Sequence, residues 1–124
     1  MDKILNYIDG KLVEPISGNY LDNYNPSTGK IYSLIPDSDK LDINRAVMAA
    51  KIAFVTWSKT PKQERSNILM KLADTIEKYS DDLIKAESKD NGKPESLAAR
   101  VDIPRAPANI RFFAGAILHD SSQI

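Results

Sequence analysis

The stretch that most restricts the fold runs from Glu87 to His119. Gly92 in this stretch suits the left-handed position just past a helix C-terminus, and Pro94 suits the first turn of a new helix. Apolar residues then recur at helical spacing, but prolines interrupt the pattern at positions 104 and 107. An interior proline removes a backbone hydrogen bond and clashes with the preceding turn. The pattern therefore predicts a long helix with a kink or break near residues 102–104.

Earlier residues predict two or three further helices. The first is expected from about Leu41 to Ser58, capped by Ser38 or Asp39. A second follows Thr60, and a short third runs through residues 80–90 or continues the second with a bend. The apolar side chains expected on one face of the first helix are Ile43, Ala46, Val47, Ala50, Ala53, Phe54 and Trp57. The aromatic residues expected to pack in a core are Phe54, Trp57, Phe112 and Phe113.

The N-terminal part predicts two antiparallel hairpins. Residues 4–13 alternate around Asp9-Gly10, a pair that favours a two-residue hairpin loop. A second pair of strands, over residues 19–24 and 30–35, flanks an Asn-Pro-Ser-Thr-Gly turn. The expected fold class is α+β and mainly helical. We expect one domain over residues 1–124, with strands at about 4–35 and helices at about 41–118.

Composition excludes several classes of protein. Lysine and arginine together number 17, as do aspartate and glutamate, so the formal net charge is zero and a nucleic-acid partner is not expected. No apolar run is long enough for a signal peptide or a membrane span, so no membrane partner is expected and a cytoplasmic location is the default. The chain has no cysteine, which excludes disulfides and thiolate ligands.

No catalytic constellation is present in the sequence. A thiolate nucleophile is excluded by the absence of cysteine, and the one histidine, His119, is expected to be a solvated or helix-end residue. Neither a Gly-x-Ser-x-Gly elbow nor a Gly-x-Gly-x-x-Gly nucleotide motif occurs. We therefore assign no catalytic residue and no cofactor-binding residue to this chain.

Two motifs in order connect the chain with a known family. ESKDNGKP at 87–94, followed by an amphipathic helix ending in RFFAGAILH, resembles the N-terminal region of NAD(P)-dependent aldehyde dehydrogenases. NPSTGK at 25–30 is the second matching motif. DIPRAPANIRFFA at 102–114 is most similar to the branch acting on aminomuconate and hydroxymuconate semialdehydes. The resemblance covers about residues 7–119.

The resemblance implies an activity that this chain lacks the parts to perform. Family members oxidise an aldehyde to an acid with NAD(P), through a catalytic cysteine that lies beyond the region matched here. Because family members are several times longer, the chain is expected to be a truncated product or an expressed fragment that stops at Ile124 before the catalytic region. We expect it to be inactive alone and to bind no cofactor.

The resemblance also implies a substrate-binding residue. The position matching Arg105 lines the substrate tunnel in the family, and an arginine there suits the carboxylate of a muconate semialdehyde. A guanidinium offers a planar fork of donors that pairs bidentately with a carboxylate. Val101, one helical turn earlier, would lie on the same tunnel wall. The alternative is that Arg105 is a surface residue paired with Asp102.

A cation site is implied in the same way. Many family members bind a monovalent cation between the aspartate of the DNGKP motif and backbone carbonyls before the Asn-Pro turn. Carried over, the ligands are Asp90 and the carbonyls of Asn23 and Tyr24, with a further carbonyl from a segment this chain lacks. The alternative is that Asp90 caps the turn at residues 91–93 or forms a salt bridge there.

A second class of function stays open beside the enzyme family. The chain could be a non-catalytic binding or oligomerisation module that reuses the same fold. Apolar helix faces that a larger enzyme would cover predict a homo-oligomer, unless the last helix folds back over them. The residues of these faces are Ala46, Val47, Ala50, Phe54 and Trp57 on one helix, and Ile110, Phe113 and Ile117 on another.

Overall fold

The computed structural model describes residues 1–119, and its contacts separate the chain into two compact units, residues 1–59 and 60–124. All the described strands lie in the first unit, and most of the helical residues lie in the second. The α+β, mainly helical class is therefore confirmed. The assignment of the whole chain to one domain stays a prediction.

The first unit contains two small sheets and one helix. A three-stranded sheet has the order β1-β5-β4, and β2 and β3 form a separate pair. The strands are β1 (Asp2–Lys3), β2 (Asn6–Ile8), β3 (Lys11–Val13), β4 (Tyr20–Asn25) and β5 (Lys30–Pro36).

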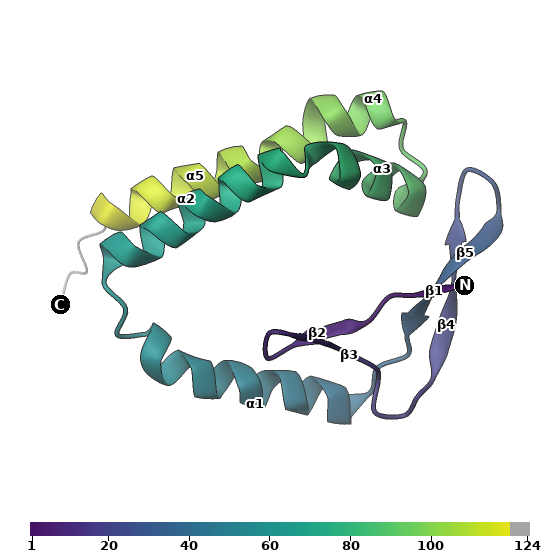
Figure 1. Ribbon diagram of the computed structural model, residues 1–124, viewed down its shortest axis with the longest axis horizontal. Helices are drawn as coiled ribbons and strands as arrows, with labels where there is room; N and C mark the ends of the chain where they lie inside the picture. Colours follow the sequence, from purple (N-terminus) through teal and green to yellow (C-terminus); the bar gives the residue numbers. More distant parts are fainter. Residues whose placement is uncertain (120–124) are drawn as a thin grey trace. The chain divides into compact units, whose positions relative to one another are not determined.

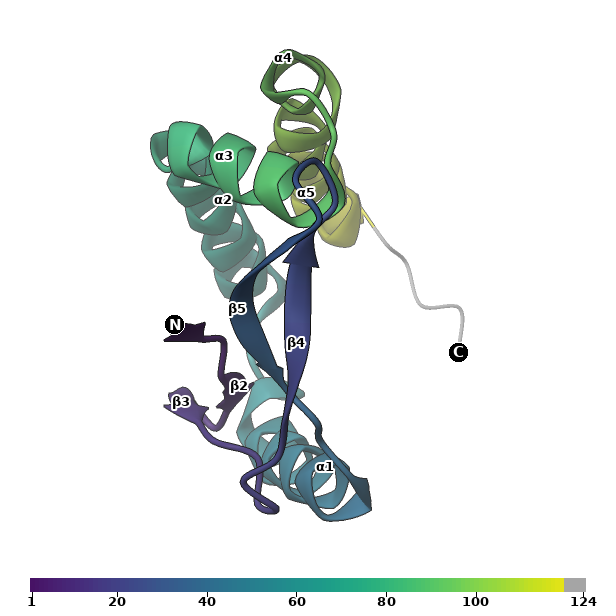
Figure 2. The same ribbon diagram turned by 90° about the vertical axis from the view of Figure 1, so that its right-hand side faces the viewer.

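Both predicted hairpins form. Asp9 and Gly10 take positive φ values of 55° and 73° between β2 and β3, as a two-residue loop of this type requires. In the turn between β4 and β5, the Asn25 side chain accepts a hydrogen bond from the Ser27 backbone N–H at 2.9 Å, and Gly29 has a φ of 65°. Figure 2 shows β4 and β5 side by side as one hairpin.

One strand pairing was not predicted from the sequence. Asp2 and Lys3 pair in parallel with Ser33 and Leu34 of β5. A two-residue strand is too short to show an alternating pattern, so the sequence carried no signal for it.

Helix α1 (Lys40–Trp57) is fixed mainly at its N-terminus. Asp39 is the N-cap, and Asp42 completes a capping box by accepting from the Asp39 backbone N–H at 3.1 Å. The other oxygen of Asp42 accepts from the Ile16 backbone N–H at 2.9 Å, which joins the loop before β4 to the helix. Asp42 is the only buried residue of α1, whereas Phe54 and Trp57 are exposed. The prediction that these two aromatic residues pack in a core was wrong.

The second unit is helical throughout. Its elements are α2 (Lys62–Lys78), α3 (Ser80–Asn91), α4 (Glu95–Leu97), η1 (Ala98–Asp102) and α5 (Ile103–His119). Helices α2 and α5 lie antiparallel, side by side (Figure 1). Ala73 and Ala114 are fully buried, and the Ser66 hydroxyl donates to the Ala114 carbonyl at 2.7 Å. Small side chains thus allow α2 and α5 to approach closely.

The irregularity predicted near the prolines is confirmed, and it takes the form of a π-helical segment. Across η1 the Ile103 backbone N–H bonds to the Ala98 carbonyl, five residues back, directly before Pro104. Pro107 lies inside α5 and is buried. Phe112 and Phe113 of α5 contact each other edge to face at 5.2 Å but remain exposed, so their predicted core role was also wrong. Among residues 1–119, no helix is both long and apolar enough to span a membrane.

Candidate functional site

Arg105 is an exposed residue at the point where the π-helical segment gives way to α5. It is the third residue of α5, directly after Pro104. Its side chain makes no hydrogen bond or ion pair with another described residue. Val101, in η1, is 42% exposed. The guanidinium of Arg105 is therefore available to an external anion.

Asp102, the alternative partner of Arg105, is paired with a lysine instead. The Lys93 ammonium lies 2.6 Å from Oδ2 of Asp102 and 3.8 Å from Oε1 of Glu87. Hydrogen bonding to Asp102 is the main cause that raises the pKa of Lys93 above its usual value. The alternative in which Arg105 pairs with Asp102 was therefore wrong.

The turn between α3 and α4 brings Lys93 to Asp102. Gly92 ends α3 in the left-handed conformation, with φ of 77°. The side chain of Asn91 accepts from the Lys93 backbone N–H at 2.8 Å and donates to Glu87 at 2.7 Å. These bonds fix the backbone of Lys93 before its side chain reaches η1.

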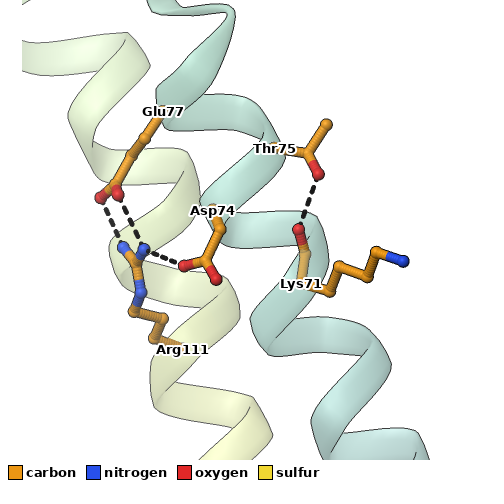
Figure 3. Close-up of polar contacts among 5 residues, drawn as sticks. All are labelled: Lys71, Asp74, Thr75, Glu77 and Arg111. Carbon is orange, nitrogen blue, oxygen red and sulfur yellow. Dashed lines mark hydrogen bonds and ion pairs between the residues drawn. The ribbon is translucent and has the colours of Figure 1, made fainter.

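A second charged cluster joins α2 to α5 (Figure 3). Arg111 donates from Nη1 and Nη2 to the two oxygens of Glu77, at 2.5 and 2.8 Å, and from Nη2 to Asp74 at 2.8 Å. Hydrogen bonds from Arg111 lower the pKa of Glu77, and the two carboxylates raise the pKa of Arg111. These pairs could not be predicted from the sequence, because the partners lie more than 30 positions apart along the chain.

A small open cavity lies within the second unit, beside this cluster. Its volume is about 240 Å³. The residues that line it are Glu77, Ser80, Ile84, Ala99, Ile103, Pro104 and Pro107. Neither Arg105 nor Val101 is among them, so the candidate substrate residues and the cavity are separate features.

The residues of the candidate cation site fall in different units. Asn23 and Tyr24 lie in β4, where a bulge interrupts the pairing with β5, and Asp90 is an exposed residue of α3. No group of three or more histidine, aspartate or glutamate side chains suited to a metal occurs within residues 1–119. The cation site, whose other ligands would be carbonyls, stays a prediction.

The connection from β5 to α1 does not fit the pyrophosphate of a dinucleotide. The connection from β5 to α1 consists of Asp37, Ser38 and Asp39. It has no glycine to let a pyrophosphate approach the backbone, and its two carboxylates would repel one. We therefore assign no NAD(P)-binding residue to this connection.

Comparison with known proteins identifies the class. The model of the "Aldehyde dehydrogenase family" matches residues 12–124. The chain belongs to this family, so the resemblance inferred from its motifs is confirmed.

Two relatives within this family are similar to the chain in sequence. It is 51% identical over 118 residues to 2-aminomuconic semialdehyde dehydrogenase of Bos taurus and 48% identical to that of Homo sapiens; each alignment covers 95% of this chain and 24% of the relative. The chain thus spans about a quarter of the length of these relatives.

Solved structures agree with the fold. The NAD⁺ complex of aldehyde dehydrogenase from Bacillus cereus matches with a TM-score of 0.88 and 35% identity, over 92% of this chain and 24% of that one. PnpE in complex with nicotinamide adenine dinucleotide matches with a TM-score of 0.88 and 38% identity, over 93% of this chain and 23% of that one.

Proposed function

We propose that this chain forms part of the substrate-binding wall of an NAD(P)-dependent aldehyde dehydrogenase whose substrate is a semialdehyde carrying a carboxylate. The observation that carries the proposal is the exposed guanidinium of Arg105, which pairs with no other residue among residues 1–119. The names of the relatives at 51% and 48% identity support this substrate class, because a muconic semialdehyde keeps one carboxylate beside its aldehyde.

Arg105 would bind and orient the substrate by its carboxylate. Its guanidinium can donate two parallel hydrogen bonds to the two carboxylate oxygens, which fixes the direction of the substrate as well as its position. Val101, one turn earlier and half-exposed, would offer an apolar surface to the carbon chain. Both residues act on binding rather than on the reacting aldehyde.

The 124-residue chain alone is proposed to be inactive and to bind no NAD(P). Oxidation of an aldehyde in this family requires a cysteine nucleophile, and this chain contains no cysteine. In addition, the connection from β5 to α1 is acidic and has no glycine, so it offers no binding site for a pyrophosphate.

The test compares the chain with a hybrid enzyme. In the hybrid, this chain replaces the matching segment of the Bos taurus relative, to which it is 51% identical. Formation of reduced cofactor is followed with NAD and a carboxylate-bearing semialdehyde. The hybrid should turn over and the isolated chain should not. Turnover by the isolated chain, or a folded hybrid that oxidises only neutral aldehydes, would refute the proposal.

A second candidate function is association with another copy of this chain. It is favoured by apolar side chains of α1 that remain exposed, including Ile52 at 70% and Phe54 at 64%. Burying apolar area gains about 25 cal/mol per Å², so a contact of modest size could offset the cost of association. Closed twofold dimers are the commonest arrangement for such contacts.

A further inference from the structure

We propose that Lys93 determines the specificity of the Arg105 site: by pairing with Asp102 it keeps Arg105 unpaired, and therefore free for the carboxylate of a substrate. This inference rests on the proposed function of Arg105. Lys93 does not contact substrate in this proposal; it is a positioning residue that acts through Asp102.

The spacing of the residues creates the competition. Asp102 and Arg105 are three positions apart where η1 continues into α5, and residues at this spacing are neighbours on a helical surface. Arg100 is also unpaired among the described residues, but it is two positions from Asp102, a spacing at which side chains do not face each other. Arg105 is therefore the cation of this stretch best placed to capture Asp102.

Lys93, rather than Arg105, pairs with Asp102 because the backbone of Lys93 is already held in place. The left-handed Gly92 and the bond from the Lys93 N–H to Asn91 hold its backbone. The Lys93 side chain is 28% exposed and the Asp102 side chain 31%, so the ion pair between them is partly shielded from water. The exposed Arg105 would have to give up the mobility of a long side chain to form the same contact, which makes an exposed pair weak.

Loss of Lys93 would change what Asp102 does. Glu87 would keep its bond from Asn91. Asp102 would become a partly buried carboxylate without a partner, next to an arginine with none. Charged groups in such surroundings gain from pairing. Arg105 would then be held by the protein's own carboxylate, which occupies the donors that the substrate needs.

Three variants of the hybrid enzyme separate this role from simple support of the fold. Lys93→Met, Asp102→Asn and the double variant all lose the salt bridge, but only Lys93→Met leaves a carboxylate beside Arg105. The KM for a carboxylate-bearing semialdehyde should rise about fivefold in Lys93→Met, from competition by an exposed pair. It should stay at the parent value in the other two and in Lys85→Met, a control that removes an exposed lysine of α3. The kcat, and the KM for a neutral aldehyde, should not change.

Equal rises of KM in all three variants would overturn the proposal, because they would show that the salt bridge only supports the fold. An unchanged KM in Lys93→Met would overturn it too. Arg105→Ala in the same hybrid distinguishes the role proposed for Lys93 from the function proposed for Arg105. A selective rise of KM in Arg105→Ala together with none in Lys93→Met rejects the role of Lys93 alone. No selective rise in Arg105→Ala rejects the function proposed for Arg105.

The isolated chain offers a test of the competition that needs no activity. The Nε–H signal of Arg105 is followed by NMR in the 124-residue chain and its variants. We expect it to shift and to slow its exchange with water in Lys93→Met, and to return to the parent position in the double variant. A signal that is the same in the parent and in Lys93→Met would show that Arg105 does not capture Asp102.

Discussion

Helix α1 and the pair formed by α2 and α5 use apolar residues in different ways. Among its described residues α1 carries large apolar side chains that stay exposed, and its one buried residue is the carboxylate Asp42. The α2–α5 pair buries small residues, Ala73 and Ala114, and adds a buried hydroxyl and a charged cluster between the helices. Helix α1 is therefore held by contacts at its N-terminus, whereas α2 and α5 are held by contacts along their length.

The difference shows that a helical stripe of large apolar residues does not reveal what covers it. The stripe of α1 is regular, yet the described residues leave Val47 and Phe54 exposed. The close approach of α2 and α5 depends instead on alanines, which contribute little to such a stripe. The large side chains of α1 thus remain exposed among the described residues, whereas small ones in α5 form a contact within the unit.

Replacing Ala114 by leucine should have the largest effect on this comparison. Ala114 is fully buried where α2 and α5 meet, so a larger side chain must push the helices apart or take a strained rotamer. The free energy of unfolding should fall by about 3 kcal/mol, the upper part of the range for overpacking. Urea unfolding followed by circular dichroism measures it. The control is Ala116→Leu, at an exposed position of the same helix, and equal losses in both variants would show that α2 and α5 do not meet at Ala114.

Replacing Asp42 by alanine should be the next largest change, and it tests the fixed end of α1. The Ile16 and Asp39 backbone N–H groups would lose their acceptor. We expect unfolding to become easier by about 1–2 kcal/mol in the same urea assay. Asn44→Ala, an exposed position two residues on, is the matched control. If Asp42→Ala were as stable as the control, the capping box would not hold α1.

A smaller effect is expected from placing a charge on the exposed stripe of α1. If copies of the chain associate through this stripe, Phe54→Glu should weaken the dimer about fivefold or more, because a carboxylate would be buried in the contact. Light scattering over a dilution series measures the mass. Lys51→Glu, another exposed position of α1, is the control for charge. A monomeric mass for the parent at every micromolar concentration would reject self-association.

The smallest effect is a change in the pH dependence of stability. Arg111 lowers the pKa of Glu77 below its usual 4.5 in the folded chain. The pair therefore stabilises the fold above the pKa of Glu77 in the unfolded chain, and this contribution is lost as pH falls through the lower folded value. Glu77→Gln should be less stable than the parent at pH 7, and the difference should shrink towards pH 3. A difference that does not depend on pH would show that Glu77 contributes no charge interaction.

Local signals in the sequence predicted the elements well. Asp9-Gly10, the Asn-Pro turn at residues 25–29 and Gly92 all act within a few residues, and each is found in its expected conformation. The irregularity before Pro104 was predicted for the same reason, because the missing N–H of a proline is a local property.

Contacts between distant residues could not be predicted in this way. The pairing of β1 with β5 and of Arg111 with Glu77 depends on how the chain folds back on itself. The same holds for Lys93 and Asp102, which are nine positions apart across a turn and a π-helical segment. For the candidate site, the sequence identified Arg105 through a family resemblance, but only the structure shows that Asp102 pairs with Lys93.

The central claim is that Arg105 binds the carboxylate of a substrate, and its most direct test is a ratio of Michaelis constants. In the hybrid enzyme, KM is measured for a carboxylate-bearing semialdehyde and for a neutral aldehyde of similar length, in the parent, in Arg105→Ala and in Arg100→Ala. Loss of a charged hydrogen-bonded pair is worth about 1–3 kcal/mol, so the ratio should rise about five- to 150-fold in Arg105→Ala. It should stay at the parent value in Arg100→Ala, which removes another exposed arginine with no partner in the described part of the chain. Equal changes of KM for both aldehydes in Arg105→Ala would contradict the claim.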